Sequence, residues 1–313
     1  MKSRFLSLVI VLAGVATVAT LLPGSAAGQQ GGGGAAPPQS VCASDDPAVF
    51  HACAKEAAKN FTPPRTTDGH PDFNAYWRHR TPAHEDLEAH PRTPEDSGGP
   101  SVIVDPPDGK VPMQAWSDAR RKESAAKFID QNIQCYQSGT PRHLYMGAYQ
   151  FIQTKDYIVM LSEETRAFRL ITLDGRPHVG KDILLWQGDS RGRWEGSTLV
   201  IETTNHNGMP WLDQRARFYT DEAKVVERLT FLDANTVHYE ATLTDLNVYA
   251  RPFTMVFPLR RNLTQGYQIM EESCYEGEGN VKHLNNLGLT RYPGITSTEA
   301  KAAKAAFERR NTR

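Results

Sequence analysis

The sequence predicts a mainly β protein, an antiparallel up-and-down barrel or a strongly curved, lipocalin-like sheet. Apolar and polar residues alternate with a period of two from about residue 149 to residue 274, a pattern typical of half-buried strands. Short turns rich in Asp, Gly and Asn separate these segments, and no helical pattern lies between them, which favours an antiparallel meander. An N-terminal arm and a few surface helices complete the predicted fold.

The first 28 residues have the composition of a secretory signal peptide. Lys2 and Arg4 precede an apolar run, and small residues follow at positions 24–28, as in segments that are removed on export. A membrane anchor is the alternative, because the run approaches the length of a spanning helix. Gln29 and Gln30 follow instead of basic residues, which favours cleavage. We therefore expect a periplasmic or secreted protein without a membrane anchor on the mature chain.

The charge of the mature chain bears on its partners. Removal of Lys2 and Arg4 leaves 33 basic and 36 acidic residues, a net charge of −3. A nucleic acid or an anionic membrane would select a basic face, so neither is expected as a partner. The expected partner is a small-molecule substrate or ligand, and no oligomeric state is indicated.

Cysteine usage supports export. The chain contains Cys42, Cys53, Cys135 and Cys274, and an even count in an exported protein predicts disulfides. Three pairings are possible, of which we favour Cys42–Cys53 with Cys135–Cys274. The first would tie a short helix to its own lead-in. The second would close a long loop, for which the chain-entropy model gives roughly 4–5 kcal/mol of stabilisation.

The elements before the sheet are predicted from local signals. A flexible tether of Gly, Gln, Ala and Pro covers residues 29–40, and Asp45-Asp46-Pro47 then begins a helix over about 48–59. Residues 61–110 are rich in Pro, Gly, Asp and His, which predicts an extended arm. An irregular apolar stripe predicts a second helix over 112–134.

Nine candidate strands follow, and a polar, Ala-rich helix beginning near Ser297 closes the chain. The predicted strands cover 149–154, 157–163, 167–173, 183–187, 193–204, 224–232, 236–245, 251–259 and 267–274. Asp189–Gly192 is predicted to be a hairpin turn. The predicted regions are a signal peptide (1–28), a tether (29–40), a disulfide-tied helix and arm (41–111), a packing helix with its lead-in (112–148), the β domain (149–290) and the C-terminal helix (291–313).

Several short motifs resemble those of a large family of exported, mostly uncharacterised bacterial proteins. They include DGRPH at 174–178, GDSRGRWEG at 188–196 and TLVIETTN at 198–205. The resemblance covers about residues 62–288. It implies export, the β fold and a disulfide between Cys135 and Cys274, but it implies no activity.

The chain departs from that family at positions that bear on chemistry. Members often have a Met and a His just after the acid that matches Glu163, where this chain has Glu164-Thr165-Arg166. They often have Asp where Ser197 stands and an apolar residue where His206 stands. A metal-binding or proton-transfer role for the missing His therefore does not carry over to this chain.

Strand parity places ionisable side chains on faces that should be buried. Glu227 shares a face with Val225, Leu229 and Phe231; Glu163 follows Tyr157, Val159 and Leu161; Arg251 precedes Phe253, Met255 and Phe257. A buried carboxylate is costly unless it is paired. The three groups therefore predict a buried ion pair, strand-end residues that reach water, or a ligand site with pKa values suited to proton transfer.

These candidates lead to an expected function, an exported enzyme that holds a small organic substrate in a barrel pocket. The chemistry expected is acid–base catalysis of the lyase, isomerase or hydrolase type. The expected catalytic groups are His178 and Glu227 as the proton-transfer pair and Glu163 as a second acid. The expected substrate-binding groups are Arg169, Arg251, Trp186, Trp194, Glu195, Trp211 and Tyr239. The alternatives are a non-catalytic, lipocalin-like carrier of an apolar molecule and an envelope protein that binds a partner through residues 61–110.

No cofactor or metal ion is expected. His178, His206, His238 and His283 are spread through the sheet, and with Glu163, Glu227 or Glu276 three of these residues could converge. None of these histidines has the close spacing to another histidine that marks a metal site. A metal site is therefore the less favoured alternative.

Overall fold

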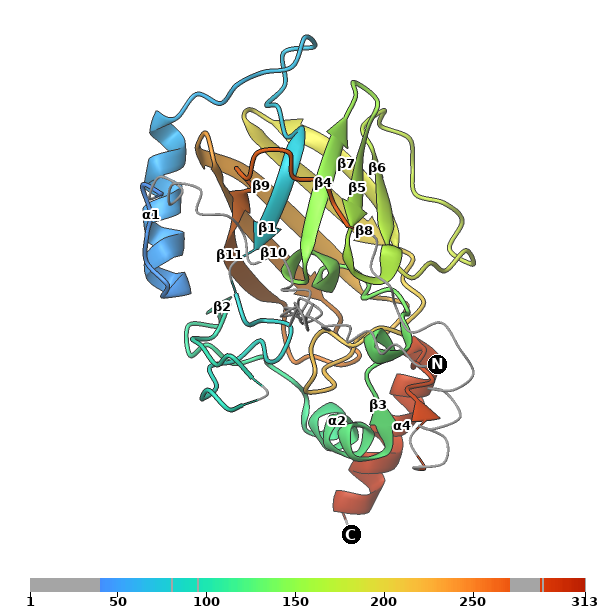
Figure 1. The fold of residues 1–313 in the computed structure, drawn as a ribbon. Coiled ribbons are helices and arrows are strands. Elements are labelled where there is room, and N and C mark those ends of the chain that lie inside the picture. The colour runs from blue at the N-terminus through green and yellow to red at the C-terminus, as the bar shows by residue number, and fades with distance from the viewer. Residues whose placement is uncertain (1–39, 80, 95, 271–287, 289, 313) are drawn as a thin grey trace, which may run out of the picture. The chain divides into compact units, whose positions relative to one another are not determined.

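The structure is a computed structural model, and it describes residues 40–79, 81–94, 96–270, 288 and 290–312. These residues form a closed β-barrel with three α-helices outside it (Figure 1). The expectation of a mainly β barrel is confirmed. The predicted signal peptide, nearly all of the tether and the region 271–287 lie outside the described residues.

Nine strands form the closed barrel, in the order β1, β4, β5, β6, β7, β8, β9, β10, β11 and back to β1. Their bounds are β1 Ala75–His79, β4 Ala148–Gln153, β5 Tyr157–Ser162, β6 Phe168–Thr172, β7 Asp189–Glu195, β8 Thr198–Thr204, β9 Lys224–Asp233, β10 Thr236–Thr244 and β11 Phe253–Arg261. A further strand, β2 (Ile103–Asp105), pairs with the beginning of β11.

Two features of the barrel differ from the predicted meander. The arm contributes the closing strand, because Trp77 of β1 lies opposite both Tyr149 of β4 and Arg261 of β11. β6 and β7 pair in parallel, whereas the other barrel pairings are antiparallel. The long connection over 173–188 makes this possible, because it returns the chain to the end of the barrel at which β6 begins.

Several local predictions are wrong, including the strand over 267–274, since residues 267–270 are not a strand. Residues 183–187 are not a strand; Ile183 and Leu184 are exposed, and Leu185 makes only an isolated bridge to His206. The predicted turn at Asp189–Gly192 lies inside β7, and the hairpin turn falls instead at Gly196, which adopts φ 62°. The second helix is shorter than predicted, because it ends at Lys127.

Side-chain caps begin two of the three α-helices in the described residues. α1 (Pro47–Asn60) has Asp46 as its N-cap, which accepts from the amide nitrogens of residues 48 and 49. α2 spans Ala115–Lys127, and α4 (Ser297–Asn311) begins with a capping box between Thr296 and Glu299. The short elements are β3 (Phe128–Ile129), β12 (Thr290–Arg291) parallel to it, and the 3-10 turns η1 (Gln131–Gln134), η2 (Arg142–Tyr145) and η3 (Glu164–Arg166).

The two ends of the barrel differ. At one end, which we call the hairpin end, tight turns join β4 to β5, β7 to β8 and β9 to β10. At the other, which we call the capped end, longer segments together with η1, η2, α2 and α4 lie beyond the strands (Figure 1). Arg142 of η2 stabilises this cap, since its Nη1 donates to Asp130 Oδ1 at 3.0 Å and to the carbonyl of Trp211 at 3.4 Å.

Large side chains fill the barrel between its ends. Phe73, Trp77, Phe151 and Phe231 are buried and contact one another, with ring centroids 4.7 Å apart for Phe73 and Phe231. Tyr239 packs against Phe257 in the same core, at 4.6 Å. The polar groups inside the barrel are therefore set in a largely aromatic interior.

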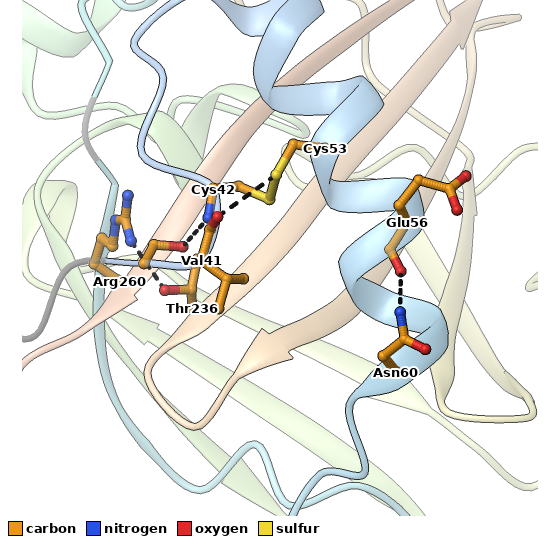
Figure 2. Close-up of a disulfide and its surroundings, with 8 residues drawn as sticks. Val41, Cys42, Cys53, Glu56, Asn60, Thr236 and Arg260 are labelled. Carbon is orange, nitrogen blue, oxygen red and sulfur yellow. Dashed lines mark hydrogen bonds between the residues drawn. A yellow bond between two sulfur atoms is a disulfide. The ribbon is translucent and has the colours of Figure 1, made fainter.

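The disulfide predicted between Cys42 and Cys53 is confirmed, with the two Cα atoms 5.8 Å apart. Figure 2 shows that it joins the lead-in to the middle of α1. Cys135 is also disulfide-bonded, and Cys274, its predicted partner, lies outside the described residues. Among the helices in the described ranges, none combines the length and apolar composition needed to cross a bilayer.

Candidate functional site

An ion pair between Arg169 on β6 and Glu227 on β9 lies inside the barrel, with both side chains buried. Arg169 Nη1 donates to Glu227 Oε1 at 2.9 Å, and Nη2 donates to Oε2. Arg169 also donates to Ser190 Oγ at 2.8 Å and Thr203 Oγ1 at 2.7 Å, while the Tyr239 hydroxyl donates to Glu227 Oε1 at 2.8 Å. The pair thus has the additional hydrogen bonds that buried charges require.

Strand alternation explains why these side chains meet. They come from the inward faces of five consecutive barrel strands, β6 to β10. The predicted interior position of Glu227 is confirmed, since Val225, Leu229 and Phe231 are buried beside it. Arg169 and Tyr239, both predicted to bind substrate, contact Glu227. The buried ion pair that strand parity left open therefore exists, with Arg169 as its cation.

A second group of polar side chains lies at the capped end, and we call it the capped-end cluster. It consists of His143 on η2, Gln187 before β7, His206 after β8 and Tyr219 before β9. All four residues are buried, and His206 and Tyr219 are completely so. Within the part of the chain that the structure describes, neither imidazole, nor the Gln187 amide, nor the Tyr219 hydroxyl has a hydrogen-bond partner.

His206 and Tyr219 of this cluster contact each other, and the backbone passes close to both. The rings of His206 and Tyr219 lie 5.0 Å apart, edge to face. A Cβ on Gly139 would stand 2.6 Å from the Tyr219 hydroxyl, and one on Gly188 would stand 2.8 Å from His206 Cε1. Both glycines have positive φ, 72° and 69°, which other residues rarely adopt. The two glycines therefore let the backbone pass close to these polar groups.

Burial and the Arg169 cation decide the protonation of the cluster. Burial lowers the pKa of His206, and the nearby guanidinium lowers it further, to about 3. The same two causes hold the pKa of His143 well below its usual range. The backbone of Gly139 raises the pKa of His143 slightly, and that of Thr203 raises the pKa of His206 slightly. Neither backbone group is aligned to form a hydrogen bond with a ring nitrogen. Burial raises the pKa of Tyr219, so all three groups are uncharged at neutral pH.

Such a cluster is unusual in a protein interior. Buried polar groups are nearly always hydrogen-bonded, and each one left without a partner costs about 1–3 kcal/mol. A neutral imidazole, an amide and a phenol each offer a donor and an acceptor. The cluster therefore complements a small molecule, or ordered waters, that can both donate and accept.

His178 lies on the other side of the sheet from Glu227. Its Nδ1 is 2.8 Å from Asp189 Oδ2, and its Nε2 is 3.6 Å from Glu202 Oε1. Asp189 and Glu202 alternate with the inward residues Ser190 and Thr203, so they face outward. The two residues predicted as a proton-transfer pair are not brought together, because the barrel wall separates them.

The interior positions predicted for Glu163 and Arg251 are wrong. The buried face of β5 carries Ile158 and Met160, and Glu163 lies beyond the end of that strand. Its Oε1 accepts from the Tyr267 hydroxyl and from the amide of Met270. Arg251 precedes β11, is half exposed and pairs with Asp105. Neither residue contributes to the interior polar groups.

The remaining predicted residues are dispersed. Trp194 stacks on His70, with ring centroids 4.8 Å apart, and contacts the core at the hairpin end. Glu195 is exposed and pairs with Arg193 and Arg228 on the outer face. Trp186 stacks on Tyr136, and Trp211 packs against Tyr292 in the cap. These positions indicate packing and surface charge pairing.

Sequence reasoning did not identify His143, Gln187 or Tyr219 as site residues, and it treated His206 only as a metal alternative. All four lie in irregular segments or a short 3-10 turn, where no periodicity predicts direction. Two glycine-containing segments, Ser138-Gly139-Thr140 and Gln187-Gly188, could have pointed to the cluster in the sequence. Glycine often marks a place where the backbone closely approaches another group.

One further group could hold a metal ion among the residues described. His51, His238 and Glu240 offer ligand atoms that all lie within 4.8 Å of one another, on the outer face of the barrel beneath α1. A groove of about 380 Å³ lies near the same helix, lined in part by Phe50, Val256 and Pro258. Both features lie outside the barrel interior.

Comparison with known proteins assigns this chain to no family. No family model matches it, and no curated protein is significantly similar to it. The resemblance to exported bacterial proteins therefore stays an expectation that rests on sequence motifs.

Proposed function

We propose that this protein is an exported enzyme that performs acid–base chemistry on a small polar organic molecule bound at the capped-end cluster. The observation that carries the proposal is a set of uncharged, buried and unpartnered donors and acceptors gathered beside the Arg169 cation. Perturbed ionisable groups of this kind concentrate at functional sites. Export is part of the proposal and is supported by the Cys42–Cys53 disulfide.

The residues of the cluster have distinct roles in this proposal. His206 and Tyr219 donate hydrogen bonds to a substrate oxygen on which negative charge develops, a form of electrostatic stabilisation that is effective in a dry site. His143 exchanges a proton with the substrate. The positive charge of Arg169 disfavours a protonated His143 imidazole. Proton transfer from the substrate to His143 therefore becomes favourable when negative charge develops on the substrate beside the imidazole.

Arg169 and Glu227 provide the electrostatic setting and are positioning residues. Four of the five guanidinium N–H groups donate to Glu227, Ser190 and Thr203. Arg169 is thereby held rigidly, and its charge acts on the cluster without requiring movement. A neutral base and a neutral acid that flank the substrate fit a lyase or isomerase better than a hydrolase that forms a covalent intermediate.

A non-catalytic carrier is the second candidate, and the burial of the cluster favours it. A ligand enclosed there would be released slowly and shielded from solvent. The unpartnered polar atoms of the capped-end cluster favour a polar ligand. The carrier expected from the sequence would bind an apolar one. A carrier would bind its ligand without exchanging protons with it.

Ligand-dependent thermal unfolding tests the proposed site. The mature protein is screened against small hydroxy, keto and carboxylic acids, in parallel with His206→Gln and Tyr219→Phe. We expect at least one compound to raise the melting temperature of the wild-type protein and to lose most of that effect in both variants. Tyr76→Phe, which alters a ring that contacts Tyr267, is the control and should respond like wild type. If no compound acts and ordered waters satisfy the cluster in a high-resolution structure, the cluster is structural.

A further inference from the structure

Helix α1 packs on the outside of the barrel through a small apolar contact. Phe50 and Ala54 of the helix pack with Leu232 of β9 and Val256 of β11. Figure 1 shows α1 beside these strands, separate from the other two helices. Between the two flanking strands lies β10, and a polar side chain of α1 meets its outer face.

That polar contact involves two histidines and a glutamate. His238 and Glu240 are two residues apart on β10, so they point to the same face of the strand. His51 approaches them from α1, with its Nδ1 3.0 Å from His238 Nε2 and 3.8 Å from Glu240 Oε2. The three ligand atoms all lie within 4.8 Å of one another.

These separations are close to those of a metal centre. Ligand atoms bound tetrahedrally to zinc at 2.0–2.1 Å stand roughly 3.3 Å apart. The His51–His238 and His51–Glu240 separations, 3.0 and 3.8 Å, lie within about half an ångström of this value. The third separation is at most 4.8 Å and exceeds it by up to about 1.5 Å, a difference that rotation of the Glu240 side chain can remove. Two imidazoles and one carboxylate are a ligand set that zinc accepts, with a fourth position for water.

The surroundings suit an ion that remains in contact with solvent. The His51 side chain is 16% exposed and that of Glu240 is 22% exposed, whereas His238 is buried. Water can therefore reach a fourth coordination position from the side of His51 and Glu240.

We propose that His51, His238 and Glu240 bind a divalent first-row metal ion, zinc by preference, which joins α1 to β10 and retains a solvent-facing coordination position. The disulfide fixes the lead-in to α1 (Figure 2), and the metal fixes α1 to the barrel. The two links act in series, so the N-terminal segment is held to the sheet. This site is independent of the capped-end cluster and of the function proposed for it.

One nearby charge opposes the ion. Lys55 lies one helical turn after His51, and its charge acts on both imidazoles. Its side chain is exposed, so it can turn toward solvent, where its repulsion of a cation is screened. Lys55→Gln should therefore strengthen metal binding only slightly, and most at low ionic strength, which a site unrelated to these residues would not show.

Zinc titration of the metal-free, full-length mature protein tests the proposal. Zinc ion alone is the probe, with calorimetry and a competing chromophoric chelator as readouts. We expect one ion per chain in wild type. His51→Gln and Glu240→Gln should each weaken binding by on the order of 100-fold, since loss of even an outer partner costs 10–100-fold. His70→Ala, remote from the site, should bind like wild type.

Two results would overturn the proposal: no stoichiometric binding by the wild-type protein, or binding that His51→Gln and Glu240→Gln leave unchanged. A second measurement covers variants that fold poorly. Amide hydrogen exchange of α1 should slow when zinc is added to wild type, and should not respond in His51→Gln. Exchange that slows equally in both would show that zinc acts elsewhere.

Discussion

Arg169 and Glu227 meet inside the barrel through two hydrogen bonds, although 58 residues separate them in the sequence. Both side chains are almost wholly inaccessible. Removing one partner of such a pair leaves a buried charge without compensation, whereas replacing both by apolar groups of similar volume is often neutral or stabilising. We therefore expect a double variant that replaces both residues to lose less free energy of unfolding than either single variant.

Glu227→Gln should destabilise the fold. The amide keeps the shape of the side chain but leaves the Arg169 guanidinium uncompensated, and we expect a loss of about 3–5 kcal/mol in the free energy of unfolding. Urea denaturation measures it. Arg169→Met combined with Glu227→Leu should lose much less. Equal losses in the single and double variants would mean that the charge itself contributes little.

Arg228→Gln is the matched control for that experiment. Arg228 adjoins Glu227 in β9 but faces outward, where it pairs with Glu195 at 2.9 Å and both side chains are about 40% exposed. An exposed pair of this kind contributes less than about 1 kcal/mol. A large loss in Arg228→Gln would contradict the assignment of inward and outward faces.

Gly139→Ala should disrupt the capped-end cluster. The new Cβ would stand 2.6 Å from the Tyr219 hydroxyl and from Pro210 Cγ, at a backbone with φ +72°. Strain and overpacking together should cost about 2–5 kcal/mol. Gly175→Ala separates the two causes, because Gly175 has φ +74° but open space around it, so it should cost only about 1–2 kcal/mol. Similar losses in both would remove the argument for close approach at Gly139.

Acid should weaken the fold through the buried histidines. In the unfolded chain His206 accepts a proton near pH 6.5, whereas in the folded protein its pKa is about 3. The unfolded state therefore binds more protons as the pH falls below about 6.5, and stability decreases by about 1.4 kcal/mol per pH unit for this group. His206→Gln should reduce the slope of the unfolding free energy between pH 6 and 5 by about that amount. An unchanged slope would mean that His206 is not buried in neutral form.

Disulfide mapping checks both predicted pairs. Non-reducing peptide mapping should show Cys42 joined to Cys53 and Cys135 joined to Cys274. Replacing Cys53 by Ser should cost about 2–3 kcal/mol, because the Cys42–Cys53 loop is short. Loss of the longer loop should cost more. A free thiol at position 135 would contradict the second pairing.

Strand parity predicted the direction of side chains correctly where a strand is long and its two faces differ in polarity. β9 has ten residues, and its buried positions alternate from Val225 to Phe231, so the direction of Glu227 could be predicted. β5 is shorter and apolar on both faces, with Ile158 and Met160 opposing Val159 and Leu161, so parity alone chose the wrong face for Glu163. The closing strand β1 was missed because it has only five residues and lies in a Pro-rich arm.

The partners of each side chain could not be predicted in the same way. Arg169 reaches Glu227 only because β7 and β8 join β6 and β9 in one curved wall. His51 meets His238 because a helix packs on a strand 187 residues later. The sequence shows His238 and Glu240 two residues apart. The third proposed ligand, His51, comes close to them only through the tertiary structure. The capped-end cluster likewise combines separate irregular segments.

Proton exchange at the capped-end cluster is the most direct test of the proposed acid–base function. A compound that stabilises the wild-type protein is incubated with it in deuterated water, and deuterium incorporation into the compound is followed by NMR. We predict incorporation by wild type at a carbon next to an oxygen-bearing group, and a loss of at least about 100-fold in His143→Gln, in line with the usual contribution of general acid–base catalysis, while binding and folding persist. Binding without any exchange by the wild-type protein would contradict the proposed chemistry and identify the protein as a carrier.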